Sequence, residues 1–360
     1  MPEVAEAHLG GLEAVRIAGE SHAHRGRTRG QRLGERIRTT AAAYAGLFTD
    51  LGIPDADQRT AAADSLAALR AWAPSQHEEV LGIAEGARLD PVDLGLTLAR
   101  TEILTLAEAA PGECSLVAHQ GQGPSVSAQT WDWYARFTDC WHLHRVEPLA
   151  GEVAHAGFTE YGMPGKIGLN AAGIGVHLNI LRHRDDRAGG VPVHSVLARV
   201  LSEATSVEDG IDLIRSAPTT SSSVLTLSSA DRVAMVEVAP GRVVVLEQDG
   251  WVLHTNHFLA EAQQDGAMLL EPGSNTHERL DYLEEATGAG GTPEVADDLL
   301  PLMCSPLQDG GVALLPDPAV PEAERLATLV TVRMDPALKR VRVSPGVPQY
   351  AQEVVVTYHL

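Results

Sequence analysis

The stretch GECSLVAHQGQGPSVSAQTWDWY, residues 112–134, decides the fold that we predict for this chain. Two runs rich in β-forming residues, SLVAHQ and PSVSAQTWDW, flank a turn-forming GQGP. This pattern predicts two antiparallel strands joined by a turn. Cys114 begins the first strand, and the return strand brings Asp132 back beside it. The sequence therefore places a thiol and a carboxylate close to each other.

The sequence before this stretch predicts helices. Residues 31–75 are rich in Ala, Leu and Arg, and apolar residues recur at helical spacing in DSLAALRAWA. In LDPVDLGLTLARTEIL, Asp90 can cap a helix that begins with Pro91. We expect this helix to end near Pro111. The first third of the chain is therefore predicted to be mostly helical.

The sequence after this stretch predicts further strands and a pair of helices. Four runs separated by turn signals predict an antiparallel meander: SSSVLTLSS, RVAMVEVAP, RVVVLEQ and WVLHTN. PVHSVLARVLSEATSVEDGIDLI predicts two amphipathic helices, the second capped by Ser206. Strands return in ATLVTVRM, KRVRVS and EVVVTYHL, whereas residues 285–325 are rich in Gly and Pro and predict loops. This order indicates an α+β fold in which helices cover antiparallel sheets.

Composition excludes several kinds of partner. The formal charge is −21 and the pI is near 5.0, so phosphate backbones and anionic membranes would repel the average surface. No run approaches the roughly 18 to 20 apolar residues of a membrane helix. The start, MPEVAEAHLGG, lacks the basic residues and apolar block of a secretory signal. We therefore expect a cytoplasmic protein with no nucleic-acid or membrane partner.

The cysteines are few and widely spaced: Cys114, Cys140 and Cys304 predict thiols rather than disulfides. The commonest role of a free cysteine is that of a small buried apolar residue. Cys114 gains another role if the peptide bond before it is cut, because it would then carry both a thiol and a free α-amino group. An α-amino group with a pKa of about 7.7 to 8.0 can accept the thiol proton near neutral pH. Cys114 is therefore a candidate N-terminal nucleophile.

Such a nucleophile needs a carboxylate to orient the amine, a neutral donor for the oxyanion and a cation that favours the thiolate. Asp132 is the candidate carboxylate. Asn256, at the end of WVLHTN, is the candidate donor, and Arg279, in SNTHERLDYL, is the candidate cation. Each also admits a structural role, as a turn residue, a strand-end cap and a solvated helix residue respectively.

Six stretches together resemble the N-terminal nucleophile (Ntn) cysteine acyltransferases and amidohydrolases: LARTEIL, GECS, TWDW, GKIGLNAAGIGVHLNIL, HTNHF and SNTHERLDYL. This family is typified by acyl-CoA:6-aminopenicillanate acyltransferase and is more distantly similar to bile salt hydrolase and penicillin V acylase. The resemblance covers roughly residues 95–285. It implies an αββα sandwich of two antiparallel sheets with a mostly helical N-terminal segment.

The resemblance also implies a role for each matched residue. Cys114 would be the nucleophile, Asp132 its orienting carboxylate and Asn256 an oxyanion donor. Asn179, in VHLNIL, matches a second asparagine near the oxyanion hole, and Arg279 matches the family arginine.

Self-cleavage between Glu113 and Cys114 would divide the chain into a helical segment, residues 1–113, and an Ntn core, residues 114–360, which we expect to remain associated.

Two positions depart from the family pattern. Glu113 stands where the acyltransferase has glycine, and Gln129 stands where bile salt hydrolases have an arginine that stabilises the thiolate. We therefore expect that arginine contact to be absent.

Two other patterns offer competing chemistry. Cys140, His142 and His144 alternate as metal ligands could on one strand face, but a fourth ligand at zinc-like spacing is missing. We expect a core or substrate-facing strand there, and we predict no metal and no cofactor. His254 or His257 could instead serve as the base for Cys114 in a cysteine–histidine dyad.

The sequence thus predicts an enzyme that opens a linear N-acyl amide. A thioester would form on Cys114, and the acyl group would pass to water or to an amine. The alternative is an uncleaved, non-catalytic protein of the same fold that binds a small molecule. The sequence determines neither the acyl and amine parts of the substrate nor the choice between hydrolysis and transfer, and assembly into a homo-oligomer stays open.

Overall fold

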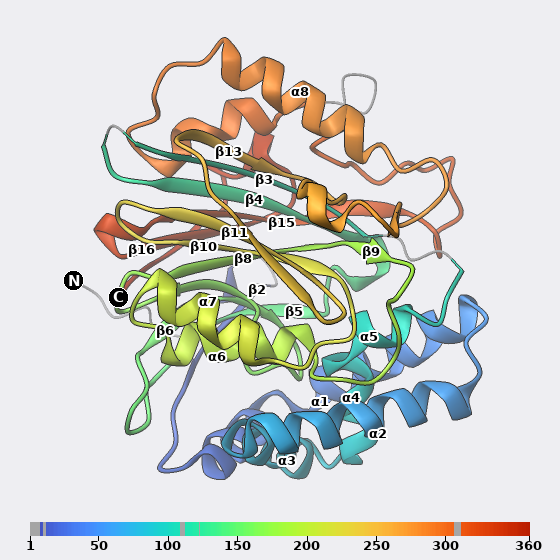
Figure 1. Ribbon diagram of the computed structural model, residues 1–360. Coiled ribbons are helices and arrows are strands. Elements are labelled where there is room, and N and C mark those ends of the chain that lie inside the picture. Colours follow the sequence, from blue (N-terminus) through green and yellow to red (C-terminus); the bar gives the residue numbers. More distant parts are fainter. Residues whose placement is uncertain (1–7, 10–11, 109–111, 122, 306–310) are drawn as a thin grey trace.

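Two β-sheets face each other in the computed structural model, which describes residues 8–9, 12–108, 112–121, 123–305 and 311–360 (Figure 1). The nine-stranded sheet has the order β1-β2-β5-β6-β7-β8-β10-β11-β12, and the six-stranded sheet has the order β13-β3-β4-β15-β16-β17. Neighbouring strands are antiparallel, except that β2 runs parallel to β5. The two predicted sheets are therefore present, with one parallel pair added by the N-terminal segment.

The strand bounds follow the chain order. The nine-stranded sheet contains β1 (His8–Leu9), β2 (Leu12–Ile17), β5 (Trp141–Val146), β6 (His155–Glu160), β7 (Ile167–Asn170), β8 (Gly175–Ile180), β10 (Ser223–Ser228), β11 (Val233–Ala239) and β12 (Arg242–Leu246). The six-stranded sheet contains β3 (Glu113–Gln120), β4 (Val126–Tyr134), β13 (Gly250–His254), β15 (Leu326–Asp335), β16 (Arg340–Pro345) and β17 (Val356–His359). A separate pair consists of β9 (Arg182–His183) and β14 (Ala267–Met268).

Helices cover the outer face of each sheet. In Figure 1, α6 (Val193–Glu203) and α7 (Val207–Ser216) lie along the nine-stranded sheet, and α8 (Thr276–Gly288) lies over the six-stranded sheet. The 3-10 helix η3 (Ala296–Met303) joins α8 on this second face, and shorter 3-10 turns are η1 (Ala135–Phe137), η2 (Glu261–Gln263), η5 (Pro336–Leu338) and η6 (Pro348–Tyr350). The layers are helix, sheet, sheet and helix, which confirms the predicted αββα sandwich.

The N-terminal segment forms a helical block against this sandwich. Its helices are α1 (His22–Asp50), α2 (Asp55–Trp72), α3 (Pro74–Ala87), α4 (Pro91–Leu98) and α5 (Arg100–Leu104). The Asp90 side chain accepts a hydrogen bond from the Val92 amide at 2.8 Å, which confirms the predicted cap. The helix is interrupted at Ala99 and ends at Leu104, earlier than predicted. Among the described residues, no helix is long and apolar enough to cross a membrane.

Glycines allow α1 and α3 to approach closely. A Cβ atom on Gly26 would lie 2.0 Å from the carbonyl oxygen of Glu79, and one on Gly82 would lie 2.3 Å from that of Ala23. Backbone atoms cannot give way as flexible side chains do. Alanine at either position would therefore force the two helices apart.

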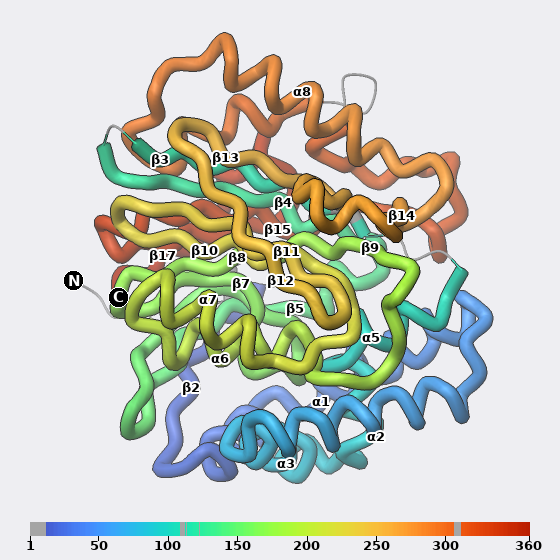
Figure 2. Tube along the Cα trace, viewed as in Figure 1, coloured from blue at the N-terminus to red at the C-terminus, as the bar shows by residue number. Residues whose placement is uncertain are grey.

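The predicted four-stranded meander is wrong in its last member. Strands β10, β11 and β12 pair in sequence, but β13 crosses to the other sheet and pairs with β3 (Figure 2). In this pairing His254 lies opposite Leu116. Local turn signals predicted a continued hairpin, whereas the actual partner lies more than a hundred residues earlier in the chain. This crossing brings the residues after β13 next to Cys114.

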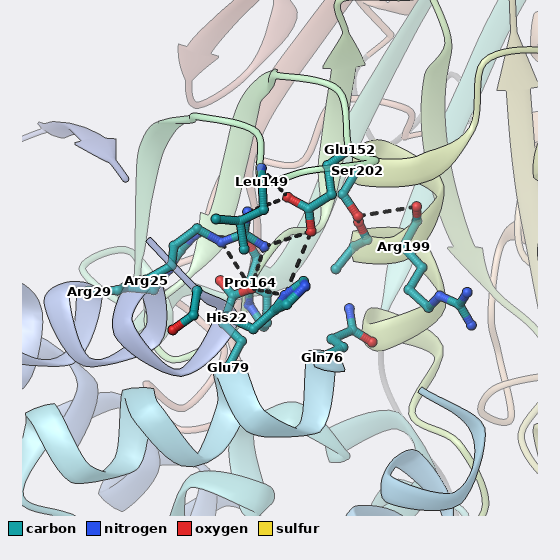
Figure 3. A network of polar contacts seen from close by, with 12 residues as sticks. His22, Arg25, Arg29, Gln76, Glu79, Leu149, Glu152, Pro164, Arg199 and Ser202 are labelled. Atoms are coloured by element: carbon teal, nitrogen blue, oxygen red, sulfur yellow. Dashed lines mark hydrogen bonds and ion pairs between the residues drawn. The ribbon is translucent and has the colours of Figure 1, made fainter. Parts of the chain in front are cut away.

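A buried charged network joins the helical block to the core (Figure 3). Arg25 of α1 donates to Glu79 of α3 at 2.6 Å and to Glu152, which lies between β5 and β6, at 3.1 Å. These three side chains are only 3% to 7% exposed. His22 lies 3.8 Å from Glu79 and 3.7 Å from Glu152 at the edge of the network. Arg25 therefore links residues on both sides of Cys114 in the sequence.

We predict that Arg25→Met lowers the free energy of unfolding by about 3 to 5 kcal/mol, because it leaves two buried carboxylates without their guanidinium partner. Chemical denaturation measures this loss. The matched control is Arg27→Met, which breaks the solvent-exposed pair between Arg27 and Glu85 on the same two helices. Equal losses in the two variants would contradict a special role for the buried network.

Candidate active site

Cys114 occupies the second position of β3, and its side chain faces the space between the sheets. It is 5% exposed and belongs to the inter-sheet core that also contains Trp131, its direct partner on β4. Burial raises the pKa of the thiol to about 12, and the nearby Asp132 carboxylate adds to this rise. Lys166 and Arg279 act in the opposite direction. The uncut chain therefore holds the thiol in its neutral form near pH 7.

The backbone of Cys114 is held by three side chains from three different elements. Its N–H donates to Asn256 Oδ1 at 2.8 Å. Its carbonyl accepts from Asn179 Nδ2 and from Arg279 Nη1, each at 2.9 Å. All three side chains are fully buried. The structure thus brings together four of the residues that the sequence singled out.

Asn256 follows β13 and has its amide orientation fixed by its neighbours. Oδ1 accepts a second hydrogen bond, from Arg279 Nη2 at 3.0 Å, while Nδ2 donates to the Ile180 carbonyl at 2.9 Å. The backbone N–H donates to Thr276 Oγ1 at 2.8 Å. In the uncut chain Asn256 therefore contacts the nitrogen of the candidate nucleophile, and its role as an oxyanion donor stays a prediction.

Asp132 lies on β4 directly opposite Glu113, the residue before the candidate nucleophile. Its two carboxylate oxygens accept hydrogen bonds from Thr328 Oγ1 at 2.6 Å and Thr130 Oγ1 at 3.2 Å. The carboxylate is fully buried. The predicted strand pairing is confirmed, and it places Asp132 beside the Glu113–Cys114 bond.

Gln129 positions one of the asparagines. Its amide nitrogen donates to Asn179 Oδ1 at 3.0 Å and to the Leu178 carbonyl at 2.7 Å. These bonds orient the Asn179 amide so that its nitrogen faces the Cys114 carbonyl. Gln129, which stands where bile salt hydrolases have an arginine, is therefore a neutral residue of the site.

The histidines that could act as alternative bases have other partners. His254 places Nε2 3.0 Å from Glu237 and Nδ1 2.9 Å from the Thr255 carbonyl. His257 places Nδ1 2.9 Å from Thr276 Oγ1. Burial lowers the pKa of His257 to about 3, so its ring is neutral near pH 7. Both rings are thus engaged with residues other than Cys114.

The alternating histidines of β5 lie in the core. His142 and His144 are fully buried, and burial together with the Arg29 charge lowers the pKa of each well below its usual value. The His142 ring stacks on Tyr161 with a centroid distance of 4.5 Å. Among the described residues there is no group of three or more His, Cys, Asp or Glu side chains arranged to hold a metal ion.

A buried charged cluster that the sequence did not indicate lies against the Trp131 ring. Glu160 accepts hydrogen bonds from Lys166 at 2.8 Å, from Arg100 at 3.1 Å and from Tyr44. Arg100 and Lys166 lie within the matched stretches LARTEIL and GKIGLN, but nothing in those strings indicates that they share one carboxylate.

A cavity of about 120 Å³ lies beside the site. Ile180, whose carbonyl holds Asn256, forms part of its wall. Its other apolar lining comes from Leu104 of α5 and from Leu181 and Leu270. Met268 of β14 also lines the cavity and is 45% exposed, so the apolar wall continues to the surface.

Comparison with known proteins supports the resemblance found in the sequence. The family profile described as acyl-coenzyme A:6-aminopenicillanic acid acyl-transferase matches residues 119–296. The 40 kDa form of the Emericella nidulans acyl-coenzyme A:6-aminopenicillanic-acid-acyltransferase is 27% identical over 227 residues, covering 61% of this chain and 62% of that relative. The chain thus spans less than two thirds of that relative's length. The resemblance to this group of acyltransferases is confirmed.

Two solved structures have limited similarity to this chain. Penicillin V acylase from Agrobacterium tumefaciens is 17% identical with a TM-score of 0.40, covering 64% of this chain and 82% of its own. A mutant of conjugated bile acid hydrolase from Clostridium perfringens is 13% identical with a TM-score of 0.48, covering 69% of this chain and 92% of its own.

We predict that Asn256→Ala lowers the free energy of unfolding by about 1 to 3 kcal/mol, because it leaves buried donors and an acceptor without partners. Chemical denaturation measures the loss. The matched control is Asn275→Ala, which removes the oxygen that accepts a hydrogen bond from Arg279 Nε at 2.9 Å and leaves the Cys114 backbone contacts in place. An Asn256→Ala variant as stable as wild type would show that the amide does not hold the site together.

Proposed function

We propose that this chain is a cysteine amidohydrolase or acyltransferase that cuts its own Glu113–Cys114 bond and then acts on a linear N-acyl amide. The observation that carries this proposal is the backbone of Cys114, held by Asn256, Asn179 and Arg279 in one buried site. The similarity to an acyltransferase family supports the same chemistry.

Self-cleavage releases the α-amine of Cys114 by a reaction of its own thiol. The Cys114 sulfur attacks the Glu113 carbonyl carbon, the carbon–nitrogen bond breaks, and the thiol proton passes to the nitrogen that leaves. Water then hydrolyses the thioester and gives a Glu113 carboxylate and a free amine on Cys114. Asp132 lies opposite Glu113, so its carboxyl group belongs to the residue paired with the bond that breaks.

In the mature protein, the new α-amine acts as the base. It replaces the Cys114 N–H that now donates to Asn256 Oδ1 at 2.8 Å, so the same oxygen orients it. An α-amine with a pKa of about 7.7 to 8.0 takes the thiol proton and later gives it to the leaving amine. Nucleophile and base then belong to one residue.

The neutral donor for the oxyanion comes from Asn256 Nδ2, which donates to the Ile180 carbonyl in the uncut chain. Removal of such a donor typically raises the barrier by about 2.7 to 4 kcal/mol. Asn179 and Arg279 hold the Cys114 carbonyl and so fix the direction from which the sulfur attacks.

The cavity of about 120 Å³ beside Ile180 suits the acyl part of the substrate. Its apolar wall would hold the apolar part of a small acyl group, because apolar surface gains free energy when it leaves water. Charged residues also line the cavity: Arg182, Arg184 and Asp186. The name of the Emericella nidulans relative supports transfer of an acyl group to an amine. Hydrolysis and transfer share the Cys114 thioester, and water access together with acceptor binding selects between them.

Contacts across the cleavage point favour two chains that stay together. Besides Arg25 and Glu152, Arg100 donates to Glu160 at 3.1 Å. Glu102 Oε1 accepts from the Val193 amide at 2.9 Å. These buried bonds join residues 1–113 to residues 114–360.

We predict that the purified protein is cut between Glu113 and Cys114, and that the two pieces elute together in size-exclusion chromatography. Edman sequencing of the larger piece should begin CSLVAHQ, and Cys114→Ala should stay uncut because it lacks the sulfur. A permanently intact chain with full activity would contradict self-activation. An intact chain that only binds a small molecule would support a non-catalytic protein of the same fold.

A second prediction tests whether the α-amine of Cys114 is the base. Residues 1–113 are co-expressed with residues 114–360, and the larger chain begins either at Cys114 or with one uncleavable residue before it. Both assemblies keep the thiol and the histidines, but only the first has the free amine on Cys114. The blocked form should turn over an N-acyl amide about 100-fold more slowly, the usual scale of general-base catalysis. Equal rates, with intact masses verified, would point to His254 or His257 instead.

A further inference from the structure

Lys166 is an unusual choice of residue for its position. The chain has 27 basic residues of the Lys and Arg types, but only two are lysines, Lys166 and Lys339. Lys339 is exposed, whereas Lys166 is 1% exposed. Arginine keeps its charge in proteins, but a buried lysine can gain or lose its proton near neutral pH. The chain therefore has one buried lysine, next to its candidate nucleophile.

Two groups fix the position of the Lys166 ammonium. Nζ donates to Glu160 Oε2 at 2.8 Å and lies 3.4 Å from the centroid of the Trp131 ring. The short distance to the ring is that of a cation–π contact. Glu160 also accepts from Arg100, so two cations share one carboxylate. With Lys166 protonated, these three side chains carry one net positive charge.

Trp131 connects this ammonium to the candidate nucleophile. It is the direct partner of Cys114 in the antiparallel ladder of β3 and β4. Directly opposed residues point to the same face, with their Cβ atoms about 4.5 to 5.5 Å apart. The thiol and the Lys166 ammonium therefore both lie on the inter-sheet side, next to the same indole. Arg279 acts from the other face, where it donates to Ser115 Oγ at 3.0 Å.

We propose that Lys166 is a positioning residue whose ammonium, held by Glu160 under Trp131, stabilises the thiolate of Cys114. This inference rests on the proposed function insofar as Cys114 is the nucleophile. In the uncut chain the α-amine is part of a peptide bond and cannot take the thiol proton. A buried cation beside the sulfur lowers the free energy of the thiolate at this stage.

The charges around Lys166 and Cys114 determine whether loss of the Lys166 charge raises or lowers the pKa of the thiol. Burial lowers the pKa of Lys166 to about 7 although Glu160 opposes this, and an ionised Cys114 raises it. In return Lys166 lowers the pKa of the thiol. The Asp132 carboxylate raises this pKa, whereas a hydrogen bond with the Asp132 backbone lowers it. The titratable and charged groups that face this cluster from the packed elements are Tyr44, Arg100, Asp132, Cys140, Glu160, His194 and Arg279. Loss of the Lys166 charge should therefore raise the thiol pKa.

The test is the rate at which a disulfide reagent such as 4,4′-dithiodipyridine modifies Cys114 in the full chain at pH 6, where Lys166 keeps its proton. This rate is proportional to the thiolate fraction, because the thiolate is the reacting form. Each variant is compared with the same variant carrying Cys114→Ser, so that only Cys114 contributes to the difference. Lys166→Gln keeps a donor for Glu160 but removes the charge. It should lower the thiolate fraction, and with it the rate, by about tenfold or more, the equivalent of one unit in the thiol pKa. Lys166→Arg keeps the charge and should restore the rate to near the wild-type value.

Lys339→Met is the matched control, because it removes the other lysine from the surface and should leave the modification rate of Cys114 unchanged. A structural role alone would not separate Lys166→Gln from Lys166→Arg in this rate. Circular dichroism identifies unfolded variants, and if Lys166→Gln unfolds, Lys166→Met is measured in its place. Equal rates at pH 6 in wild type and the neutral variant, or failure of both neutral variants to fold while Lys166→Arg folds with a changed rate, would overturn the proposal.

A second readout separates this inference from the proposed function. The rate at which the Glu113–Cys114 bond is cut is measured across pH in the same variants. If wild type is never cut, the proposed self-activation fails, but the modification rate of Cys114 at pH 6 still decides the role of Lys166. If wild type is cut and the modification rate is unchanged in Lys166→Gln, Lys166 has no part in ionising the thiol.

Discussion

The site depends on the pairing of β13 with β3, which crosses from one sheet to the other. Five residues of β13 pair with β3, from Gly250 opposite Gln120 to His254 opposite Leu116. Because the ladder ends there, Asn256 emerges beside the start of β3 and accepts the Cys114 N–H. Without this pairing, Asn256 would continue the meander on the outer edge of the nine-stranded sheet. The Cys114 N–H and Arg279 Nη2 would then lose the oxygen acceptor that they share.

Burial imposes the second constraint, because a buried thiol resists ionisation. The pKa of Cys114 is raised to about 12 by burial, and the Asp132 carboxylate opposes the thiolate as well. Cations on both faces of the strand oppose this: Arg279 from the side of α8, and Lys166 from the inter-sheet side. Charges so close to a buried sulfur act through a medium of low dielectric, where they have a larger effect than on the surface. If Cys114 is the nucleophile that we propose, the same burial that protects the thiol makes the nearby cations important for its ionisation.

Local features of this fold could be predicted from sequence, whereas features that depend on distant partners could not. The β3–β4 pair followed from two runs of β-forming residues around a turn, and the Asp90 and Ser206 caps followed from residue type and position. The route of β13 could not be predicted, because turn signals describe only neighbouring residues. Lys166 could not be assigned to the site either, since the Trp131 ring becomes its neighbour only when the two sheets pack face to face.

The arrangement around the Cys114 nitrogen links the precursor to the mature enzyme that we propose. Asn256 Oδ1 accepts the peptide N–H before cleavage and can accept an amine N–H after it without moving. The Cys114 carbonyl is not part of the Glu113–Cys114 bond, so its hydrogen bonds to Asn179 and Arg279 can persist after that bond is cut. The proposed cleavage would therefore change the chemistry of the Cys114 nitrogen while the groups that position it are already in place. A site organised in this way loses little free energy to rearrangement when it becomes active, which is the condition for electrostatic preorganisation.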